Sequence, residues 1–471
     1  MARSGFNYIR KLLNTEFHNT LKFIKSLMNE SKFPNGIPYI IGNEFAERFS
    51  YYGMKAILTV FMTDFLLGSD GLLDPMSDDE SKVYFHLFAM ATYGFPLIGA
   101  IISDVVWGKY KTIIILSIVY CAGHVALALD ETRLGLSLGL TMIAIGSGGI
   151  KPCVSAHVGD QFGESNSDLI EKIFSIFYLS INMGAAISTI LTPYLLKEYG
   201  PSVAFGIPGG LMILATIVFW MGRNVYTSVA PSGWSKFKDD IVEKDGYKVL
   251  LSLSLIYVFI AMFWSLFDQT GSSWILQAKS ELVNKNVDLL FWSGELLPSQ
   301  IQAVNPLMIL VFVPLFSFVV YPLINSFFPL TSLRKISIGM FVATLSFVLI
   351  AIMQAKMDNG IEVSIMGQFW AYAVLTAAEV MVSITALEFS YKQAPNSMKS
   401  LVMGLFLLSV SLGNGIAALV NSLIMNVDGN SVLAGANYFW FFVGLMGITS
   451  LIFIVVAMKY KEKTFIQEHG E

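Results

Sequence analysis

Long apolar segments alternate with short polar stretches along the whole chain of 471 residues. Each segment is about 20 residues long or longer, which is the length that an α-helix needs to cross a membrane. The segments fall at about 37–66, 83–103, 111–130, 134–158, 173–196, 203–222, 248–278, 301–325, 336–355, 364–391, 400–426 and 436–458. We therefore predict an all-α membrane protein with twelve transmembrane helices.

The polar stretch 223–247 is rich in Lys, Asp, Ser and Gly, and it divides the apolar segments into two groups of six. This division predicts an N-terminal six-helix bundle over residues 36–222 and a C-terminal six-helix bundle over 248–458, joined by a cytoplasmic connector over 223–247. The connector is too short to hold a further pair of membrane-spanning helices.

The two ends of the chain are expected on the cytoplasmic side. Residues 1–35 carry apolar side chains at spacings of three or four with lysines between them, which indicates either an interfacial helix on the inner leaflet or a basic tail. With the N-terminus in the cytoplasm, most Lys and Arg residues outside the spans fall on the cytoplasmic side. This bias predicts that the tail 459–471 is cytoplasmic too, in a multi-pass protein of the cell (inner) membrane.

Composition narrows the function classes. Hydrophobic residues make up 55% of the chain and charged residues 14%, about half the ~25% charged residues of soluble domains. A formal net charge of −4 lacks the basic surplus of a nucleic-acid binder. Cys121 and Cys153 lie in apolar stretches and give no disulfide framework. We find no nucleotide-binding loop, metal-ligand spacing or catalytic constellation, so we expect no enzyme and no cofactor, and energy from an ion gradient.

Several charged residues lie inside the first predicted span. A charge at the bilayer centre costs about 2.5–3.5 kcal/mol, so its presence suggests a function. On a helix of 3.6 residues per turn, one stripe holds Glu44, Arg48, Tyr51, Tyr52 and Lys55, with Glu47 beside it. We expect this stripe to face a wet cavity, because two acids and two bases within twelve residues exceed what a packing ion pair requires.

Complementary charges occur in the later spans. Lys151 lies in the fourth span, Asp268 in the seventh and Glu379 in the tenth. If the two bundles are related by pseudo-symmetry, span 1 corresponds to span 7 and span 4 to span 10. This correspondence predicts Lys55 opposite Asp268, and Lys151 opposite Glu379. Such pairs suit a transporter whose bundles rock against each other, whereas a channel does not need them.

The charged stripe and five further blocks resemble the proton-coupled oligopeptide transporter (POT) family, a branch of the major facilitator superfamily. The blocks are Glu44-x-x-Glu47-Arg48-Phe49-x-Tyr51-Tyr52, Gly99-Ala-x-x-x-Asp104-x-x-x-Gly108-Lys-Tyr-Lys-Thr112, Gly148-Gly-Ile-Lys151-Pro-Cys-Val-Ser155, Phe174-Ser-Ile-Phe-Tyr178-Leu-Ser-Ile-Asn182-Met-Gly184, Phe263-Trp-Ser-Leu-Phe-Asp268-Gln, and Glu379 followed by Glu388-Phe-Ser-Tyr391 and Ala394-Pro. The resemblance implies the major facilitator fold and symport of protons with di- and tripeptides, in a chain that works as a monomer in the lipid bilayer.

The resemblance also implies roles for individual residues. Proton coupling is expected at Glu44, Glu47, Arg48, His86 and Asp268. Peptide binding is expected at Tyr51, Tyr52, Lys55, Tyr93, Lys151, Asn182, Trp264, Asn305, Glu379 and Ser383, with Lys151 and Arg48 toward the peptide carboxylate and Glu379 toward its amine. Charge-assisted bonds to both termini would give affinity that does not depend on side-chain identity. For His86, a place at the cavity rim without any part in coupling is an equally good interpretation.

The sequence departs from the family pattern in two places. Leu405 stands where many bacterial relatives have Trp, so side-chain preference is expected to differ. The stretch Lys356–Val363 leaves no room for the large outer domain of animal members, which favours a prokaryotic-type member. Two other functions stay open: a carrier of another small solute such as nitrate, and a non-transporting membrane receptor. Glu379 argues against nitrate, because an anion carrier does not need a carboxylate that binds an amine.

Overall fold

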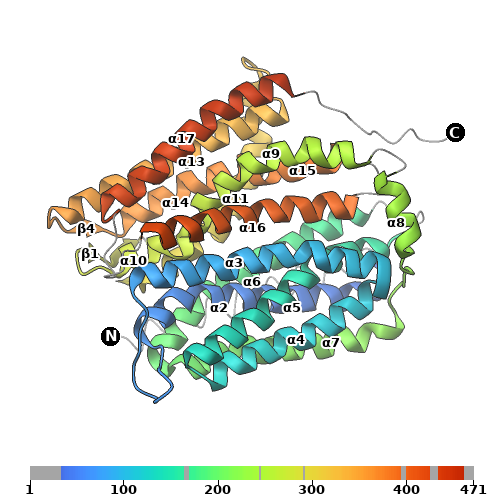
Figure 1. Cartoon of the computed structure of the whole chain (residues 1–471), viewed down its shortest axis with the longest axis horizontal. Helices are drawn as coiled ribbons and strands as arrows, with labels where there is room; N and C mark the ends of the chain where they lie inside the picture. The colour runs from blue at the N-terminus through green and yellow to red at the C-terminus, as the bar shows by residue number, and fades with distance from the viewer. Residues whose placement is uncertain are drawn as a thin grey trace.

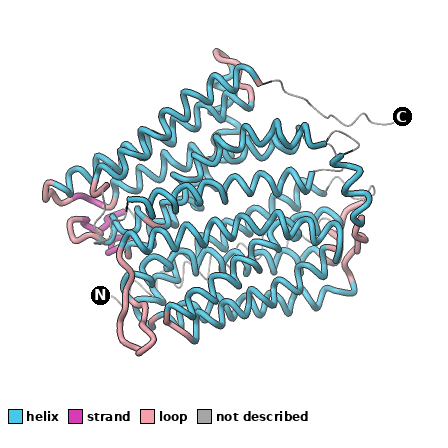
Figure 2. The backbone as a smooth tube through the Cα atoms, viewed as in Figure 1, coloured by secondary structure: helices cyan, strands magenta, loops and turns pink. Residues whose placement is uncertain are grey.

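The computed structural model describes residues 33–163, 169–242, 246–289, 292–393, 399–424 and 433–460. Most of the predicted segment 1–35 and of the predicted tail 459–471 lies outside these residues. Within the described ranges, eleven helices are long and apolar enough to cross a membrane. A further long helix, α2 (Ile37–Asp64), packs among them and corresponds to the charged first span. The predicted all-α, multi-pass membrane fold is confirmed (Figures 1 and 2).

The first half of the chain forms one bundle, in the lower part of Figure 1. Its helices are α2, α3 (Asp78–Ile101) with the π-helical turn η1 (Ile102–Trp107), α4 (Lys109–Leu129), α5 (Arg133–Asp160), α6 (Ile170–Tyr199) and α7 (Pro201–Met221). Helix α3 begins before the predicted residue 83, because Ser77 caps it and Asp78, Asp79 and Glu80 occupy its first turn. Acidic side chains at that end stabilise a helix.

The second half forms the other bundle, and several of its spans are interrupted. The seventh span consists of α9 (Gly246–Phe267), the 3₁₀ turn η4 (Asp268–Gly271) and α10 (Ser273–Lys279). The eighth consists of η5 (Pro298–Ala303), α11 (Val304–Leu315), η6 (Phe316–Val320) and α12 (Tyr321–Asn325). The remaining spans are α13 (Ser332–Asp358), α14 (Met366–Glu379) with η7 (Val380–Ile384) and α15 (Thr385–Gln393), α16 (Lys399–Ile424) and α17 (Ala436–Lys459).

The interruptions lie where the sequence weakens regular helical bonding. Pro314 has no amide hydrogen and cannot bond to the carbonyl four residues earlier, and the π-helical turn η6 begins two residues after it, at Phe316. In the seventh span, the 3₁₀ turn η4 begins at the charged residue Asp268. These breaks place irregular backbone inside the bundle, which membrane proteins tolerate where it is covered by protein or lines a cavity.

Short elements mark the two ends of the molecule. The connector contains an additional helix that the sequence analysis did not predict, α8 (Gly233–Val242), at one end of the spans (Figure 1). The amide and the hydroxyl of Ser232 both donate to the Asp104 carbonyl, at 2.7 and 3.0 Å. At the opposite end, β1 (Val283–Asn284) pairs in parallel with β4 (Val363–Ser364), and β2 (Asn286–Leu289) pairs antiparallel with β3 (Trp292–Glu295).

Each bundle has its own apolar core, and the bundles meet along two helix pairs. Helix α3 packs against α16, and α6 packs against α11. Within the N-terminal bundle α3 and α5 approach so closely that a Cβ added to Gly99 would lie 2.2 Å from the Gly149 carbonyl. Small residues allow such close contact between membrane helices. Large apolar side chains such as Leu129 and Phe318 remain about 80% exposed, as expected for a surface that faces lipid.

Candidate functional site

The acids of α2 form a buried cluster with the arginine of the same helix. Arg48 Nε lies 2.6 Å from Glu44 Oε1 and 3.2 Å from Glu47 Oε2. Both acids are buried, at 1% exposure. Glu47 also accepts a hydrogen bond of 2.9 Å from the Ser147 hydroxyl on α5. One face of α2 thus holds two carboxylates around one guanidinium and connects to the fourth span.

A cavity of about 180 Å³ lies between the two bundles. Its wall contains the predicted residues Tyr52, Lys55, Asn182, Asp268, Asn305 and Glu379. Most drug-sized ligands occupy sites of roughly 300–1,000 Å³, so the cavity in this conformation suits a very small solute. It is mainly enclosed by polar and aromatic side chains from α2, α6, the seventh and eighth spans and α14.

Glu379 is held in place by the eighth span. Asn305 Nδ2 donates to Glu379 Oε2 at 2.7 Å and to the Thr376 hydroxyl at 3.1 Å. Glu379 is the last residue of α14, where the helix changes into the π-helical turn η7. The carboxylate therefore stands at the cavity wall with an amide donor on one oxygen and no ion-pair partner among the described residues.

Lys151 lies against aromatic rings and not against a carboxylate. Its Nζ is 4.0 Å from the centroid of the Tyr51 ring and 4.3 Å from that of Tyr93. The ammonium is buried and has no hydrogen-bond partner among the described residues. The predicted facing of Lys151 and Glu379 is therefore not an ion pair in this conformation, because the cation is stabilised by the faces of two tyrosine rings on its own bundle. Neither Lys151 nor these tyrosines belong to the cavity wall.

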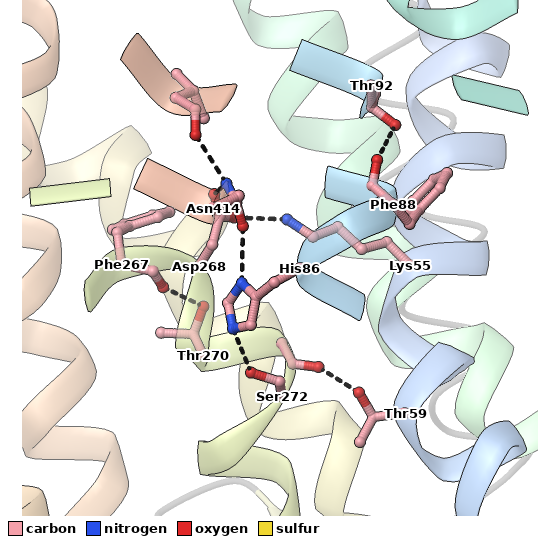
Figure 3. A network of polar contacts seen from close by, with 12 residues as sticks. Lys55, Thr59, His86, Phe88, Thr92, Phe267, Asp268, Thr270, Ser272 and Asn414 are labelled. Atoms are coloured by element: carbon pink, nitrogen blue, oxygen red, sulfur yellow. Dashed lines mark hydrogen bonds and ion pairs between the residues drawn. The ribbon is translucent and has the colours of Figure 1, made fainter. Parts of the chain in front are cut away.

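Lys55 and Asp268 form a buried ion pair between the bundles. Lys55 Nζ lies 2.7 Å from Asp268 Oδ1, so the structure brings together the two charges that pseudo-symmetry placed opposite each other. Next to this pair, the Thr59 hydroxyl donates to the Gly271 carbonyl at 2.6 Å. Gly271 has no room for a side chain, since an added Cβ would lie 2.2 Å from the Phe85 ring. Figure 3 shows Lys55 pointing from α2 toward Asp268.

The ion pair continues into a chain of neutral hydrogen bonds that reaches His86. Asn414 Nδ2 donates to Asp268 Oδ2 at 2.7 Å, and Asn414 Oδ1 lies 2.8 Å from His86 Nδ1. Since that amide oxygen can only accept, the Nδ1 nitrogen carries the hydrogen. His86 Nε2 lies 3.0 Å from the Ser272 hydroxyl (Figure 3). His86 is thus fully buried and connected to Asp268 through one amide, away from any cavity rim.

Further polar contacts join the two bundles at the end of the molecule opposite α8. Lys279 contacts Asp64 and the Thr63 hydroxyl. Gln302 Nε2 donates to the Ala56 carbonyl at 3.1 Å, and Gln300 Nε2 donates to the Ile190 carbonyl at 2.9 Å. The bundles are therefore tied together by polar contacts on the side of the membrane that faces away from the connector.

Comparison with known proteins gives the family. The POT family profile (PTR2) matches residues 110–242 and 232–441 of this chain. The chain belongs to the POT family. It is 38% identical over 407 residues to solute carrier family 15 member 2 of Rattus norvegicus, covering 76% of this chain and 54% of that protein. The chain thus spans about half the length of the curated relatives it matches.

Solved POT structures resemble the chain over nearly their whole length. A structure described as an auto-inhibited POT family peptide transporter has a TM-score of 0.81 and 32% identity, covering 93% of this chain and 99% of that one. Another, described as a proton dependent oligopeptide (POT) family transporter, has a TM-score of 0.73 and 35% identity over 88% and 100% of the two chains. These likenesses confirm the predicted family, while the prokaryotic-type assignment stays a prediction.

Within this POT chain, the other predicted binding residues lie in mixed surroundings. The Asn182 side chain lines the cavity and donates to the Tyr178 carbonyl at 2.9 Å. Trp264 is buried against Phe263 and Phe267, with its indole nitrogen unpaired among the described residues. Ser383 is half-buried in η7, outside the cavity wall. Leu405, the departure from the bacterial pattern, packs at the edge of the C-terminal core.

Four residues that hydrogen-bond to the predicted site residues, or to the helix that carries them, were not among those predicted. They are Ser147, Ser272, Gln302 and Asn414, all of them neutral. Asn414 carries a polar signal, because an unpaired amide is costly in a membrane span, but Asn421 on the same helix carries the same signal. The two serines had no such signal, since serine is common in membrane helices and usually bonds to its own helix backbone.

Proposed function

We propose that this chain is a proton-driven symporter that carries di- and tripeptides into the cell by alternating access. Membership of the POT family supports this proposal, and two solved relatives are described as a peptide transporter and as a proton dependent oligopeptide transporter. The observation that carries it is the Glu379 carboxylate on the wall of a small cavity between two bundles. A carboxylate in that place suits a substrate that has an amine.

In the proposed mechanism the termini of the peptide are bound by opposite charges. Glu379 binds the peptide amine, and Asn305 keeps its carboxylate oriented. Lys151 binds the peptide carboxylate together with Arg48, and its buried ammonium without a hydrogen-bond partner supports this role. Charge-assisted hydrogen bonds of this kind are about twice as strong as neutral ones. Tyr52 and Asn182 then contact the peptide backbone or side chains.

Proton coupling is assigned to two charged clusters, one outside the cavity wall on α2 and one whose Lys55 and Asp268 line the cavity. Glu44, Glu47 and Arg48 form the first, and Lys55, Asp268 and His86 form the second. Protonation of an acid removes its attraction for the neighbouring cation. In the second cluster the ion pair joins the two bundles, so protonation of Asp268 would weaken the contact that holds this end closed and allow the bundles to rock.

The orientation of the proposed transporter in the membrane follows from the distribution of its basic residues. Excess Lys and Arg on the connector side supports cytoplasmic termini and a connector in the cytoplasm. The polar contacts between the bundles opposite α8 would then close the outer side of the transporter. We propose that the chain works as a monomer in the cell membrane, because every charge assigned to binding or coupling comes from one copy.

Uptake into proteoliposomes tests the proposal. The purified chain is reconstituted, an inward proton gradient is imposed, and labelled dialanine is followed with and without a proton ionophore. We expect accumulation above equilibrium that the ionophore abolishes, loss of uptake in Glu379→Gln, and normal uptake in Glu388→Gln, whose exposed carboxylate contacts Lys392 outside the cavity. If labelled nitrate is taken up in response to the gradient and dialanine is not, the proposed peptide substrate is wrong and the chain carries another solute.

A further inference from the structure

A groove of about 690 Å³ opens on the surface of the C-terminal bundle between α13 and α17. The two helices pack side by side and antiparallel along the edge of the bundle (Figure 1). The groove lies at the end of the molecule where α13 begins and α17 ends, the same end as α8. It is distinct from the cavity between the bundles and shares none of its residues.

The mouth of this groove carries an arginine without an acidic partner. The Arg334 guanidinium lies 4.8 Å from the centroid of the Phe328 ring, and its Nη1 donates to the Pro329 carbonyl at 2.6 Å. Among the described residues no carboxylate lies within ion-pair distance of it. A guanidinium has five N–H donors in a planar fork that matches phosphate. Arg334 is exposed, so most of these donors remain accessible.

The floor of the groove is apolar and runs toward the middle of the membrane. On α13 it is formed by Ile338 and Phe341, about 6 and 10 Å along the helix from Arg334. On α17 it is formed by Met458 at the mouth and Ile454 one turn deeper. Polar groups at the membrane boundary and apolar groups below them match the order of parts in a phospholipid.

We propose that this groove binds an anionic phospholipid of the leaflet at the α8 end, with the phosphate at Arg334 and an acyl chain along Ile338, Phe341 and Ile454. The uncompensated guanidinium selects the negative head group, because basic pockets between membrane helices attract anionic lipids. A free phosphate ion would satisfy the arginine but would leave the apolar floor unused. The groove therefore favours the lipid as the source of the phosphate.

A second surface groove differs from the first because it contains an acidic side chain. It measures about 560 Å³, lies between the eighth and tenth spans, and contains Lys335, the residue next to Arg334. This groove also contains the Glu388 carboxylate, which repels a phosphate, and Lys335 lies over the Tyr321 ring at 4.2 Å. The two neighbouring basic residues thus face different grooves, and the lipid site is assigned to the one that lacks an acid.

Native mass spectrometry of the full chain tests the site. The protein is titrated with phosphatidylglycerol or phosphatidylcholine of identical acyl chains, and retained lipid is counted. We expect phosphatidylglycerol to bind at least about fivefold more tightly, and Arg334→Gln to remove most of this preference. Arg334→Lys should retain part of it. Ile338→Trp, which fills the floor and leaves the arginine in place, should weaken both lipids.

Arg223→Gln is the matched control. Arg223 also lies at the α8 end, stacks on a ring (Trp220, 3.9 Å) and donates to a backbone carbonyl, but it lies outside the groove between α13 and α17. An equal loss of preference in Arg223→Gln would overturn the proposal, as would displacement of the lipid by excess inorganic phosphate. A chain that sheds lipid on forming a dimer would assign the groove to a second copy and overturn it as well.

Discussion

The hydroxyl of Ser147 donates a hydrogen bond of 2.9 Å to Oε1 of Glu47, so the fourth span is bonded directly to the charged cluster of the first. Ser147 stands one helical turn before Lys151, on the same face of α5. One face of one helix therefore touches a proposed proton carrier and carries a proposed substrate ligand. Any movement of α5 that follows peptide binding at Lys151 would displace the Ser147 hydroxyl from the Glu47 carboxylate.

Removal of this hydroxyl should weaken coupling without removing the acid. In Ser147→Ala, Glu47 keeps Arg48 but loses a buried donor, which costs about 1–3 kcal/mol. We expect proton-driven dialanine uptake to fall roughly tenfold, and exchange of labelled for unlabelled peptide to persist. The control is Ser155→Ala on the same helix, whose hydroxyl donates to the Pro152 carbonyl and to no side chain among the described residues. Equal effects of the two serine variants would contradict a role for Ser147 in coupling.

The span-1 acids should separate coupling from binding. Glu47→Gln or Glu44→Gln keeps the side-chain shape but removes the titration and leaves Arg48 with one carboxylate fewer. Gradient-driven accumulation should then be lost, while counterflow continues, because exchange needs movement of the loaded carrier and no net proton transfer. Both activities are measured on the same proteoliposomes. If both fall together with thermal stability, the acids serve only to brace the helices.

Binding of the two peptide termini should depend on Lys151 and Glu379. Lys151→Ala and Glu379→Gln should each reduce dialanine affinity by about a hundredfold or more, because an unpaired buried charge costs roughly 3–5 kcal/mol. Lys151 has no ion-pair partner among the described residues, so its removal should leave thermal stability nearly unchanged. An acetylated dipeptide should bind poorly to the wild type. Equal competition by acetylated and free dialanine would show that Glu379 does not bind the amine.

The sequence predicted spans, bundles and the charged face of α2, because the membrane makes each apolar segment and each buried charge conspicuous. It could not predict which charges meet. Lys55 and Asp268 are in contact, whereas Lys151 and Glu379 are not, although the same pseudo-symmetry argument paired both. Pseudo-symmetry relates positions on helices, but the distance across the cavity depends on how far the bundles have rocked at that level.

Neutral partners were beyond the reach of the sequence for another reason. Asn414 and Ser272 complete the link from Asp268 to His86, yet helical periodicity does not distinguish them from the many other polar residues in the spans. The breaks in the seventh and eighth spans were hidden as well, since a 3₁₀ or π-helical turn leaves apolar periodicity almost unchanged. Tertiary contact, and not local propensity, decides these features.

The final prediction concerns the ion pair between the bundles, whose burial determines how much stability is lost when one partner is removed. The side chains of Lys55 and Asp268 are only 11% and 4% exposed. Removal of one partner of a buried pair typically costs about 3–5 kcal/mol, since the other charge is left in a poorly solvated site. Lys55→Met should therefore lower the thermal unfolding temperature clearly. Lys392→Met breaks the exposed pair with Glu388 and should have little effect, because surface pairs contribute about 0–1 kcal/mol.

The double variant Lys55→Met, Asp268→Asn shows whether the pair acts as a contact to be made and broken or merely as a structural bond. With both charges removed no orphan charge remains, and Asn414 can still bond to the new amide, so stability should largely return. Driven uptake should not return, because the contact between the bundles no longer contains an acid whose protonation could release it. Thermal unfolding and uptake are measured on the same preparations. Recovery of both properties would assign the pair to stability alone, and a Lys55→Met protein as stable as Lys392→Met would contradict a contribution of the pair to the contact between the bundles.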